Sequence, residues 1–83
     1  MASIHALVRG QRYQIMREFV DYDGGLHSVG ETWLFEGTTF VPYDDELTLH
    51  VRAHGVPRAY RLQWRPEEQE AIIENFTDFI TAC

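Results

Sequence analysis

The chain has 83 residues, of which 45% are hydrophobic and 24% are charged, and its formal net charge is -6. This length suits one domain and leaves no room for two, and the composition is that of a folded protein rather than a disordered one. The negative charge argues against direct nucleic-acid binding, because neutralising phosphates takes a basic surface. All seven basic residues are arginines, so chemistry that requires a lysine, such as Schiff-base formation, is excluded.

The cellular location is predicted from what the chain lacks. It has no run of the roughly 20 apolar residues that a membrane-spanning helix needs, and its first residues do not form a signal peptide. The single cysteine, Cys83, cannot form an internal disulfide, which agrees with a reducing compartment. We therefore expect a cytoplasmic protein that makes no contact with a membrane.

The first half of the chain predicts short strands separated by turns. Residues 13–20 are rich in aromatic and β-branched side chains, and the aspartates and glycines of residues 21–25 are typical of a turn. Two further short strands are predicted at residues 32–36 and 39–41, where Gly37 separates them and Pro42 ends the second.

The second half contains the clearest strand pattern. Apolar and polar residues alternate over residues 47–52 and again over residues 58–64. A period of two is typical of strands with one buried face. The connection at residues 53–57 is short and contains a glycine, so we expect an antiparallel hairpin.

After Trp64 the pattern changes to that of a helix, predicted at about residues 66–81. Pro66 suits a first helical position, because its missing N–H would have had no partner there. The apolar residues that follow recur on one helical stripe: Ile72, Ile73, Phe76, Phe79 and Ile80. Strands followed by one helix predict an α+β fold, either a small curved antiparallel sheet or an SH3-like partly open barrel of about five strands. We expect a single domain over residues 1–83, with its core in residues 7–80.

Five motifs follow one another along the chain: Leu7-x-x-Gly10-x-x-Tyr13, Phe19-x-Asp21-Tyr22-Asp23-Gly24, Val29-Gly30-Glu31-x-Trp33-x-Phe35-x-Gly37, Phe40-x-Pro42-Tyr43-Asp44-Asp45 and Arg61-Leu62-Gln63-Trp64-Arg65-Pro66-Glu67-Glu68-Gln69. Together they resemble the small bacterial family catalogued as domain of unknown function 3601. The resemblance covers residues 7 to about 80. It implies that the fold is shared with that family, and it implies no activity.

Trp33 is the most informative single side chain. Alternation along its strand places Trp33 and Phe35 on one face and Leu34 on the other. The first interpretation is that Trp33 belongs to the core, because so short a chain needs its largest side chains there. The alternative is a displayed aromatic patch formed by Trp33 with Tyr22 and Tyr43, because interfaces favour tyrosine and tryptophan.

Two charged surfaces are predicted. Arg52 and Arg61 would share the outer face of the predicted hairpin, where they could bind carboxylates. On the predicted helix, an acidic ridge has carboxylates about 4.5 to 6 Å apart along the axis: Glu67, Glu70, Glu74 and Asp78. Each surface could also be an ordinary solvated face.

No catalytic, metal or cofactor site is predicted. His50 and His54 would lie about 13 Å apart along a strand, too far to share a zinc ion. Asp21 and Asp23 are interpreted as turn residues. Neither a serine nucleophile motif nor a phosphate-binding glycine loop occurs in the sequence.

The leading functional hypothesis is a small, non-enzymatic protein-interaction module whose partner is another protein. One alternative is an acidic inhibitor whose carboxylates imitate nucleic-acid phosphates and so block a nucleic-acid-binding protein. Another is a small-ligand or catalytic domain that uses Asp21, Asp23 and the histidines. The sequence leaves a homodimer open, since a sheet with an edge strand can pair with itself.

Overall fold

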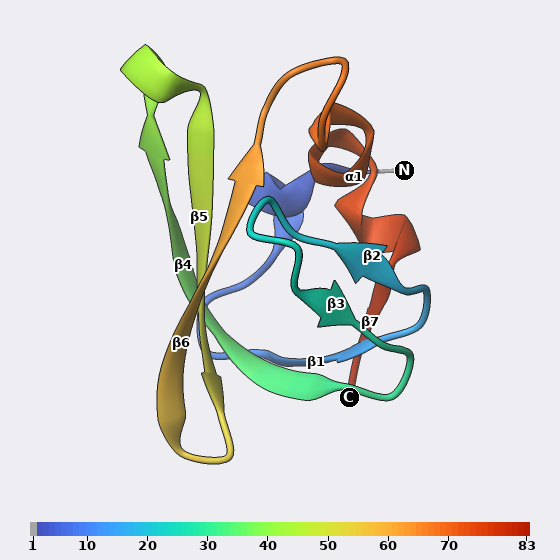
Figure 1. Ribbon diagram of the computed structural model, residues 1–83. Coiled ribbons are helices and arrows are strands. Elements are labelled where there is room, and N and C mark those ends of the chain that lie inside the picture. Colours follow the sequence, from blue (N-terminus) through green and yellow to red (C-terminus); the bar gives the residue numbers. More distant parts are fainter. Residues whose placement is uncertain (1) are drawn as a thin grey trace.

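A computed structural model describes residues 2–83, and it contains seven strands and one short α-helix (Figure 1). The strands are β1 (Arg12–Ile15), β2 (Phe19–Val20), β3 (Leu26–His27), β4 (Thr32–Val41), β5 (Glu46–Ala53), β6 (Val56–Gln63) and β7 (Ile80–Ala82). The helical segments are α1 (Glu70–Glu74) and three 3₁₀ turns, η1 (Ile4–Ala6), η2 (Pro42–Asp44) and η3 (Phe76–Asp78).

Five of the strands form one antiparallel sheet in the order β6-β5-β4-β1-β7, and β2 pairs with β3 in a separate small hairpin. In the part of the chain that the structure describes, the edge strands β6 and β7 do not pair with each other, so the sheet is open. This confirms the predicted α+β class with an antiparallel sheet and a C-terminal helix, whereas the SH3-like barrel is not confirmed. Among residues 2–83, no helix is long and apolar enough to cross a membrane.

The strands predicted on either side of Gly37 are one strand, β4, so the prediction of two strands was wrong. The pairing of β4 with β5 shifts register between Phe35 and Gly37, which leaves Glu36 as the extra residue of a β-bulge. Gly37 has φ +146°, a backbone conformation that favours glycine. The glycine therefore bends the strand without ending it.

The single strand predicted over residues 13–20 is instead divided into β1 and β2. Residues 16–18 are exposed and lie outside both strands. The backbone N–H groups of Met16 and Arg17 donate to the carbonyl of Phe79, so the chain turns away from the sheet here. Strand β2 then pairs with β3, with Phe19 opposite His27.

The predicted hairpin of β5 and β6 is confirmed. Ala53 is opposite Val56, so His54 and Gly55 form a two-residue turn. Both turn residues have positive φ, 52° and 77°, which is the backbone that suits the right-handed twist of the flanking strands.

The helix predicted at about residues 66–81 is much shorter than expected, since α1 covers only Glu70–Glu74. Asn75 follows α1, with φ -121° and a side-chain amide that donates to the carbonyl of Ala71. Beyond η3, the chain pairs with the edge of the sheet as β7, where Ile80 is opposite Ile15. Strand pairing at this edge overrides the helical pattern of the sequence.

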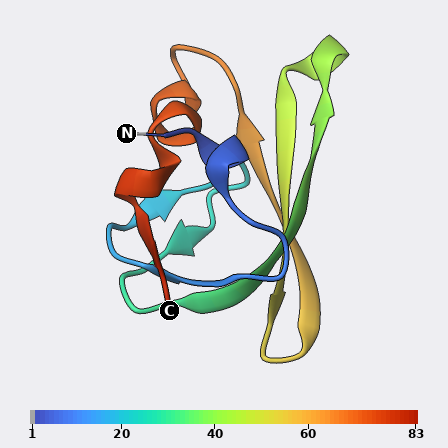
Figure 2. The same ribbon diagram turned by 180° about the vertical axis from the view of Figure 1, so that it is seen from behind.

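The core lies on the inner face of the curved sheet. Both ribbon views show η1, the β2–β3 hairpin and the α1–η3 segment beside this face (Figures 1 and 2). Alternate residues of the long strands point inward, including Leu47, Leu49 and Val51 of β5. They pack with Ile73 and Phe76 of the C-terminal segment in one buried cluster.

Candidate functional site

Trp33 is a core residue, so the prediction that it contacts a partner protein was wrong. Its exposed fraction is 0%, and its ring centroid lies 6.0 Å from that of Tyr13. The indole N–H is buried without a hydrogen-bond partner in the described chain. Trp33 therefore cannot reach a partner protein, and the first interpretation from sequence is the correct one.

The other two members of the predicted aromatic patch are exposed but lie on different loops. Tyr22 is 45% exposed in the turn between β2 and β3, beneath the guanidinium of Arg61 at 5.9 Å from the ring centroid. Tyr43 is 94% exposed in η2, between β4 and β5. Because Trp33 is buried in the core, the predicted three-residue patch does not form.

Tyr43 instead has exposed apolar neighbours at the end of β4. Phe40 and Val41 precede it in the chain and are both exposed. The ring of Phe40 packs edge-on against Trp64, with centroids 5.6 Å apart. We call Phe40, Val41 and Tyr43 the aromatic tip. Phe40 was not predicted as a contact residue, because the alternation of apolar residues along its strand did not indicate that it is exposed.

The turn that carries Tyr43 is held by the segment that follows β6. Asp45 has φ 52° and accepts a hydrogen bond from the backbone N–H of Trp64 at 2.7 Å. The Gln63 side chain donates to the carbonyl of Asp44, and Arg65 donates to the Asp45 carboxylate at 3.2 Å. These contacts hold the backbone at Asp44 and Asp45, directly after Tyr43.

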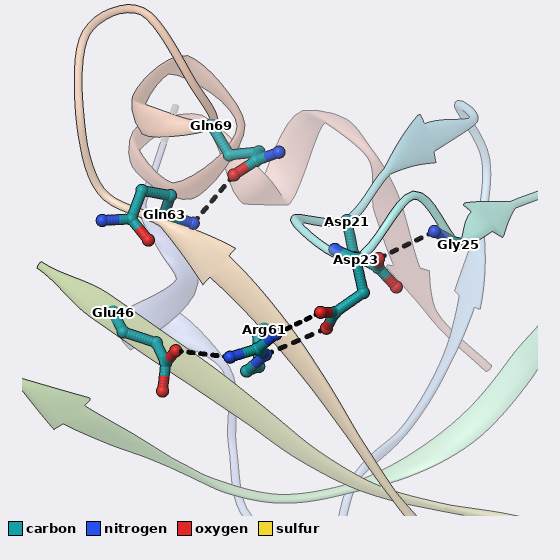
Figure 3. Close-up of polar contacts among 7 residues, drawn as sticks. All are labelled: Asp21, Asp23, Gly25, Glu46, Arg61, Gln63 and Gln69. Carbon is teal, nitrogen blue, oxygen red and sulfur yellow. Dashed lines mark hydrogen bonds and ion pairs between the residues drawn. The ribbon is translucent and has the colours of Figure 1, made fainter. Parts of the chain in front are cut away.

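Gln63 is itself fixed by a second set of contacts. Its backbone N–H donates to the side-chain oxygen of Gln69 at 2.8 Å, and the Gln69 N–H donates to the Gln63 carbonyl at 3.0 Å (Figure 3). Gln63 is buried although it is polar. The support of the aromatic tip thus extends to the start of α1.

The two predicted contact arginines bind carboxylates of the same chain. Arg52 donates to Glu36 at 3.2 Å and to the Gly55 carbonyl at 3.1 Å. Arg61 binds both Asp23 and Glu46, as Figure 3 shows. They are on the outer face as predicted, but their carboxylate-binding groups are already occupied.

The Arg61 hydrogen bonds lower the pKa of the Asp23 carboxyl, although partial desolvation opposes the shift. The same contact, together with the charge of Asp23, raises the pKa of the Arg61 guanidinium. Both groups are exposed, so solvent screens the pair and its contribution to stability is small.

The predicted acidic ridge does not lie on one helix. Glu70 and Glu74 are both in α1, whereas Asp78 lies in η3. Glu74 accepts a hydrogen bond from the Trp64 indole at 3.2 Å. Desolvation and then the charge of Glu74 raise the pKa of Glu70. The even spacing of carboxylates on which phosphate mimicry depended is therefore absent from the described chain.

A buried polar cluster, which the sequence did not predict, surrounds His27. The His27 ring is 4% exposed, and its Nε2 lies 2.8 Å from the Asp21 carboxylate while its Nδ1 lies 2.9 Å from that of Glu31. Phe19 stacks on the ring at a centroid distance of 4.8 Å, and Tyr60 meets it edge-on at 4.3 Å.

Asp21 also organises the turn between β2 and β3. Its Oδ1 accepts hydrogen bonds from the backbone N–H groups of Asp23 and Gly25, at 2.9 and 2.8 Å. A Cβ at Gly25 would lie only 2.6 Å from the other carboxylate oxygen, so a side chain at that position would displace Asp21. This confirms the interpretation of Asp21 as a turn residue (Figure 3).

The cluster links the β2–β3 hairpin to Glu31 and Tyr60. Each ring nitrogen of His27 lies within hydrogen-bond distance of a carboxylate of the same chain. The two carboxylates lie on opposite sides of the ring. In the described part of the chain, no three His, Cys, Asp or Glu residues are grouped to hold a metal ion.

Tyr60 should make stability sensitive to alkaline pH. Burial raises the pKa of its phenol, and the charge of Glu31 raises it further. As pH rises through about 10, the unfolded chain loses this proton before the folded chain does, so stability falls. We expect the melting temperature to fall less steeply between about pH 9 and 11 in Tyr60→Phe than in the native chain. The matched control is Tyr43→Phe, and an equal effect in both variants would contradict the prediction.

The comparisons with known proteins agree with the fold. A model of the family described as "Domain of unknown function (DUF3601)" matches residues 4–81. A solved integron cassette protein from the mobile metagenome of Vibrio cholerae is 30% identical, with a TM-score of 0.92, and the match covers 100% of this chain and 92% of that one. No curated protein shows significant similarity.

Proposed function

The chain belongs to the DUF3601 family, as its motifs predicted, and the family description names no activity. We propose that the protein is a small, non-enzymatic protein-interaction module that presents the aromatic tip to a partner protein. The observation that carries this proposal is the exposure of Tyr43, which is 94%. A small domain gains most by burying its aromatic side chains, so a tyrosine left in solvent beside exposed Phe40 and Val41 is available for a second protein.

The rigidity of the turn supports the same role. Binding is opposed by the entropy lost when flexible groups are ordered at an interface. The contacts from Gln63, Trp64 and Arg65 already order the backbone of residues 42–45. Tyrosine adds a large contact area with few rotatable bonds and a hydroxyl that can hydrogen-bond at the rim.

The partner surface should offer an apolar pocket with polar groups around it. Phe40 and Val41 provide apolar area, while carboxylates adjoin the turn at Asp44 and Asp45. A flat basic surface without a pocket would bind the carboxylates and leave Tyr43 in water. We therefore expect hot-spot behaviour at Tyr43, with less effect from its charged neighbours.

Site-specific photo-crosslinking in living cells of the native host tests this proposal. A photoreactive phenylalanine analogue at position 43 should give a discrete adduct with a partner protein. The same analogue at Val56, which is exposed at the far end of the β5–β6 hairpin, should not. With the partner purified, Tyr43→Ala should weaken binding about 30-fold or more, as expected for a hot spot.

The stability of each variant must be measured alongside binding. We expect Tyr43→Ala to change the free energy of unfolding by no more than about 0.5 kcal/mol, because the side chain is exposed. Equal crosslinking at positions 43 and 56, or unchanged affinity of Tyr43→Ala for the captured partner, would remove the aromatic tip as the contact surface.

A further inference from the structure

A shallow cleft lies between η1 and β4, apart from the aromatic tip. Its volume is about 260 Å³, and its lining residues come from the N-terminal segment and from the bulge region of β4: Ile4, His5, Leu7, Arg9, Phe35, Gly37 and Thr38. Ile4, Leu7 and Phe35 are buried core residues beneath the cleft, so they offer a ligand only a small apolar area. His5 and Arg9 are exposed, and Thr38 is half-buried. The surface open to a ligand is therefore mostly polar and basic, over a small apolar floor.

The bulge in β4 makes room for the guanidinium of Arg9. Gly37 is buried beneath it, and a Cβ added to Gly37 would lie 3.0 Å from Arg9 Nη2. A side chain at this position would be strained by φ +146° and would also press on the guanidinium. Because Gly37 has no side chain, the guanidinium of Arg9 can lie close to the backbone of β4.

Among residues 2–83, four arginines form no ion pair: Arg9, Arg12, Arg17 and Arg58. Arg52, Arg61 and Arg65 each form an ion pair with a carboxylate of the chain. Arg9 forms none with any residue from 2 to 83, although the protein has an excess of carboxylates. Its donors are thus available to a ligand in the cleft.

His5 lies on the other side of the same cleft and is held in place by an aromatic contact. Its ring centroid is 5.7 Å from that of Trp64, whose indole donates to Glu74. The Ser3 hydroxyl accepts a hydrogen bond from the His5 backbone N–H at 3.2 Å, which fixes the start of η1. A histidine ring carries at least one N–H donor in either protonation state.

From these contacts we propose that the cleft binds a small carboxylate attached to a compact apolar group, with Arg9 and His5 as donors to the carboxylate. The planar guanidinium fork matches the two oxygens of a carboxylate. The small apolar floor would contact the edge of the adjoining hydrocarbon part, which a phosphate or sulfate ion lacks. The cleft is somewhat smaller than the roughly 300 to 1,000 Å³ of drug-sized sites, so it suits a small acid or a single terminal residue.

The net charge of -6 does not prevent this binding. Repulsion from distant surface carboxylates is screened over about 10 Å at 0.1 M salt, whereas a direct guanidinium contact acts at hydrogen-bond distance. Raising the ionic strength should therefore weaken binding only modestly. This proposal does not depend on the aromatic tip, and each can fail without the other.

Two sources could supply this chemistry, a free organic acid or the C-terminal carboxylate of a peptide. The test is a titration of isotope-labelled protein, followed by amide NMR, with phenylacetate and with acetyl-glycyl-phenylalanine. The matched neutral probes are phenylacetamide and the C-terminally amidated peptide. We expect saturable shifts at the amides of Gly37 and Thr38 with the carboxylates, at millimolar affinity, and binding about fivefold or more weaker with the amides.

The decisive variant is Arg9→Gln, which should weaken carboxylate binding about fivefold or more while leaving the rest of the spectrum in place. The control is Arg58→Gln, which removes an exposed arginine of β6 outside the cleft and should change nothing. Tighter binding of the peptide than of phenylacetate would assign the site to chain ends, and the reverse would assign it to free acids. Equal binding of acids and amides, unchanged binding in Arg9→Gln, or no saturable shift with either acid would overturn the proposal.

Discussion

Replacing Trp33 by alanine should lower the free energy of unfolding by about 3–5 kcal/mol. The side chain is completely buried, and its removal would leave a cavity beside Tyr13 in the core of a small domain. Small domains have total stabilities near the low end of about 5–15 kcal/mol, so the variant should be partly unfolded at room temperature. Urea denaturation followed by circular dichroism measures this effect without depending on tryptophan fluorescence.

Two comparisons make the Trp33 experiment specific. Trp33→Phe removes the unpartnered indole N–H as well as part of the ring. It should therefore lower the free energy of unfolding by less than Trp33→Ala does. Tyr43→Ala serves as the exposed aromatic control and should be nearly neutral. If Trp33→Ala lowered the free energy of unfolding as little as Tyr43→Ala does, Trp33 would not be a central core residue.

Replacing Asp21 by alanine should also destabilise the protein by about 3–5 kcal/mol, because its buried carboxyl group makes three hydrogen bonds and each buried group left unsatisfied costs about 1–3 kcal/mol. His27 Nε2 would then face no acceptor, and the backbone N–H groups of Asp23 and Gly25 would lose theirs. Denaturant unfolding measures the loss. Asp44→Ala is the matched control, since Asp44 is an exposed aspartate in a turn.

A double-mutant cycle with His27→Ala separates the Asp21–His27 contact from the role of Asp21 in the turn. We expect a coupling energy of about 1–3 kcal/mol between the two positions. The single His27→Ala variant should be destabilised as well, since it removes the hydrogen-bond partner of the Asp21 and Glu31 carboxyl groups and the ring that packs against Phe19 and Tyr60. Strictly additive effects would mean that Asp21 acts only through the backbone of its turn.

The strand pattern could be predicted wherever one face of a strand is buried. Alternation in β5 identified Leu47, Leu49 and Val51 as inward-facing, and they are fully buried. Strand ends were less predictable, because Gly37 reads as a break in sequence but serves as a bulge in β4. The C-terminal helix was overestimated because the apolar spacing of residues 72–80 also fits a short helix, a 3₁₀ turn and a strand.

The candidate site was predicted less well than the fold. Tyr43 was a candidate because interfaces favour tyrosine, whereas Phe40 looked like an ordinary strand residue. The cluster around His27 gave no sequence signal beyond three polar residues within eleven positions. The cleft at Arg9 could not be anticipated, because it depends on how η1 packs against the bulge in β4.

By itself, the sequence determined the family, the α+β class, the antiparallel β5–β6 hairpin and the burial of one face of β5, since these follow from local motifs and from the period of apolar residues. Only the tertiary structure decided that Trp33 is buried, that Arg52 and Arg61 are already paired, and that Arg9 is not. The physical reason is that burial and charge pairing depend on which segments meet in space. Residues such as Asp23 and Arg61 are 38 positions apart, and no local pattern in the sequence specifies their contact.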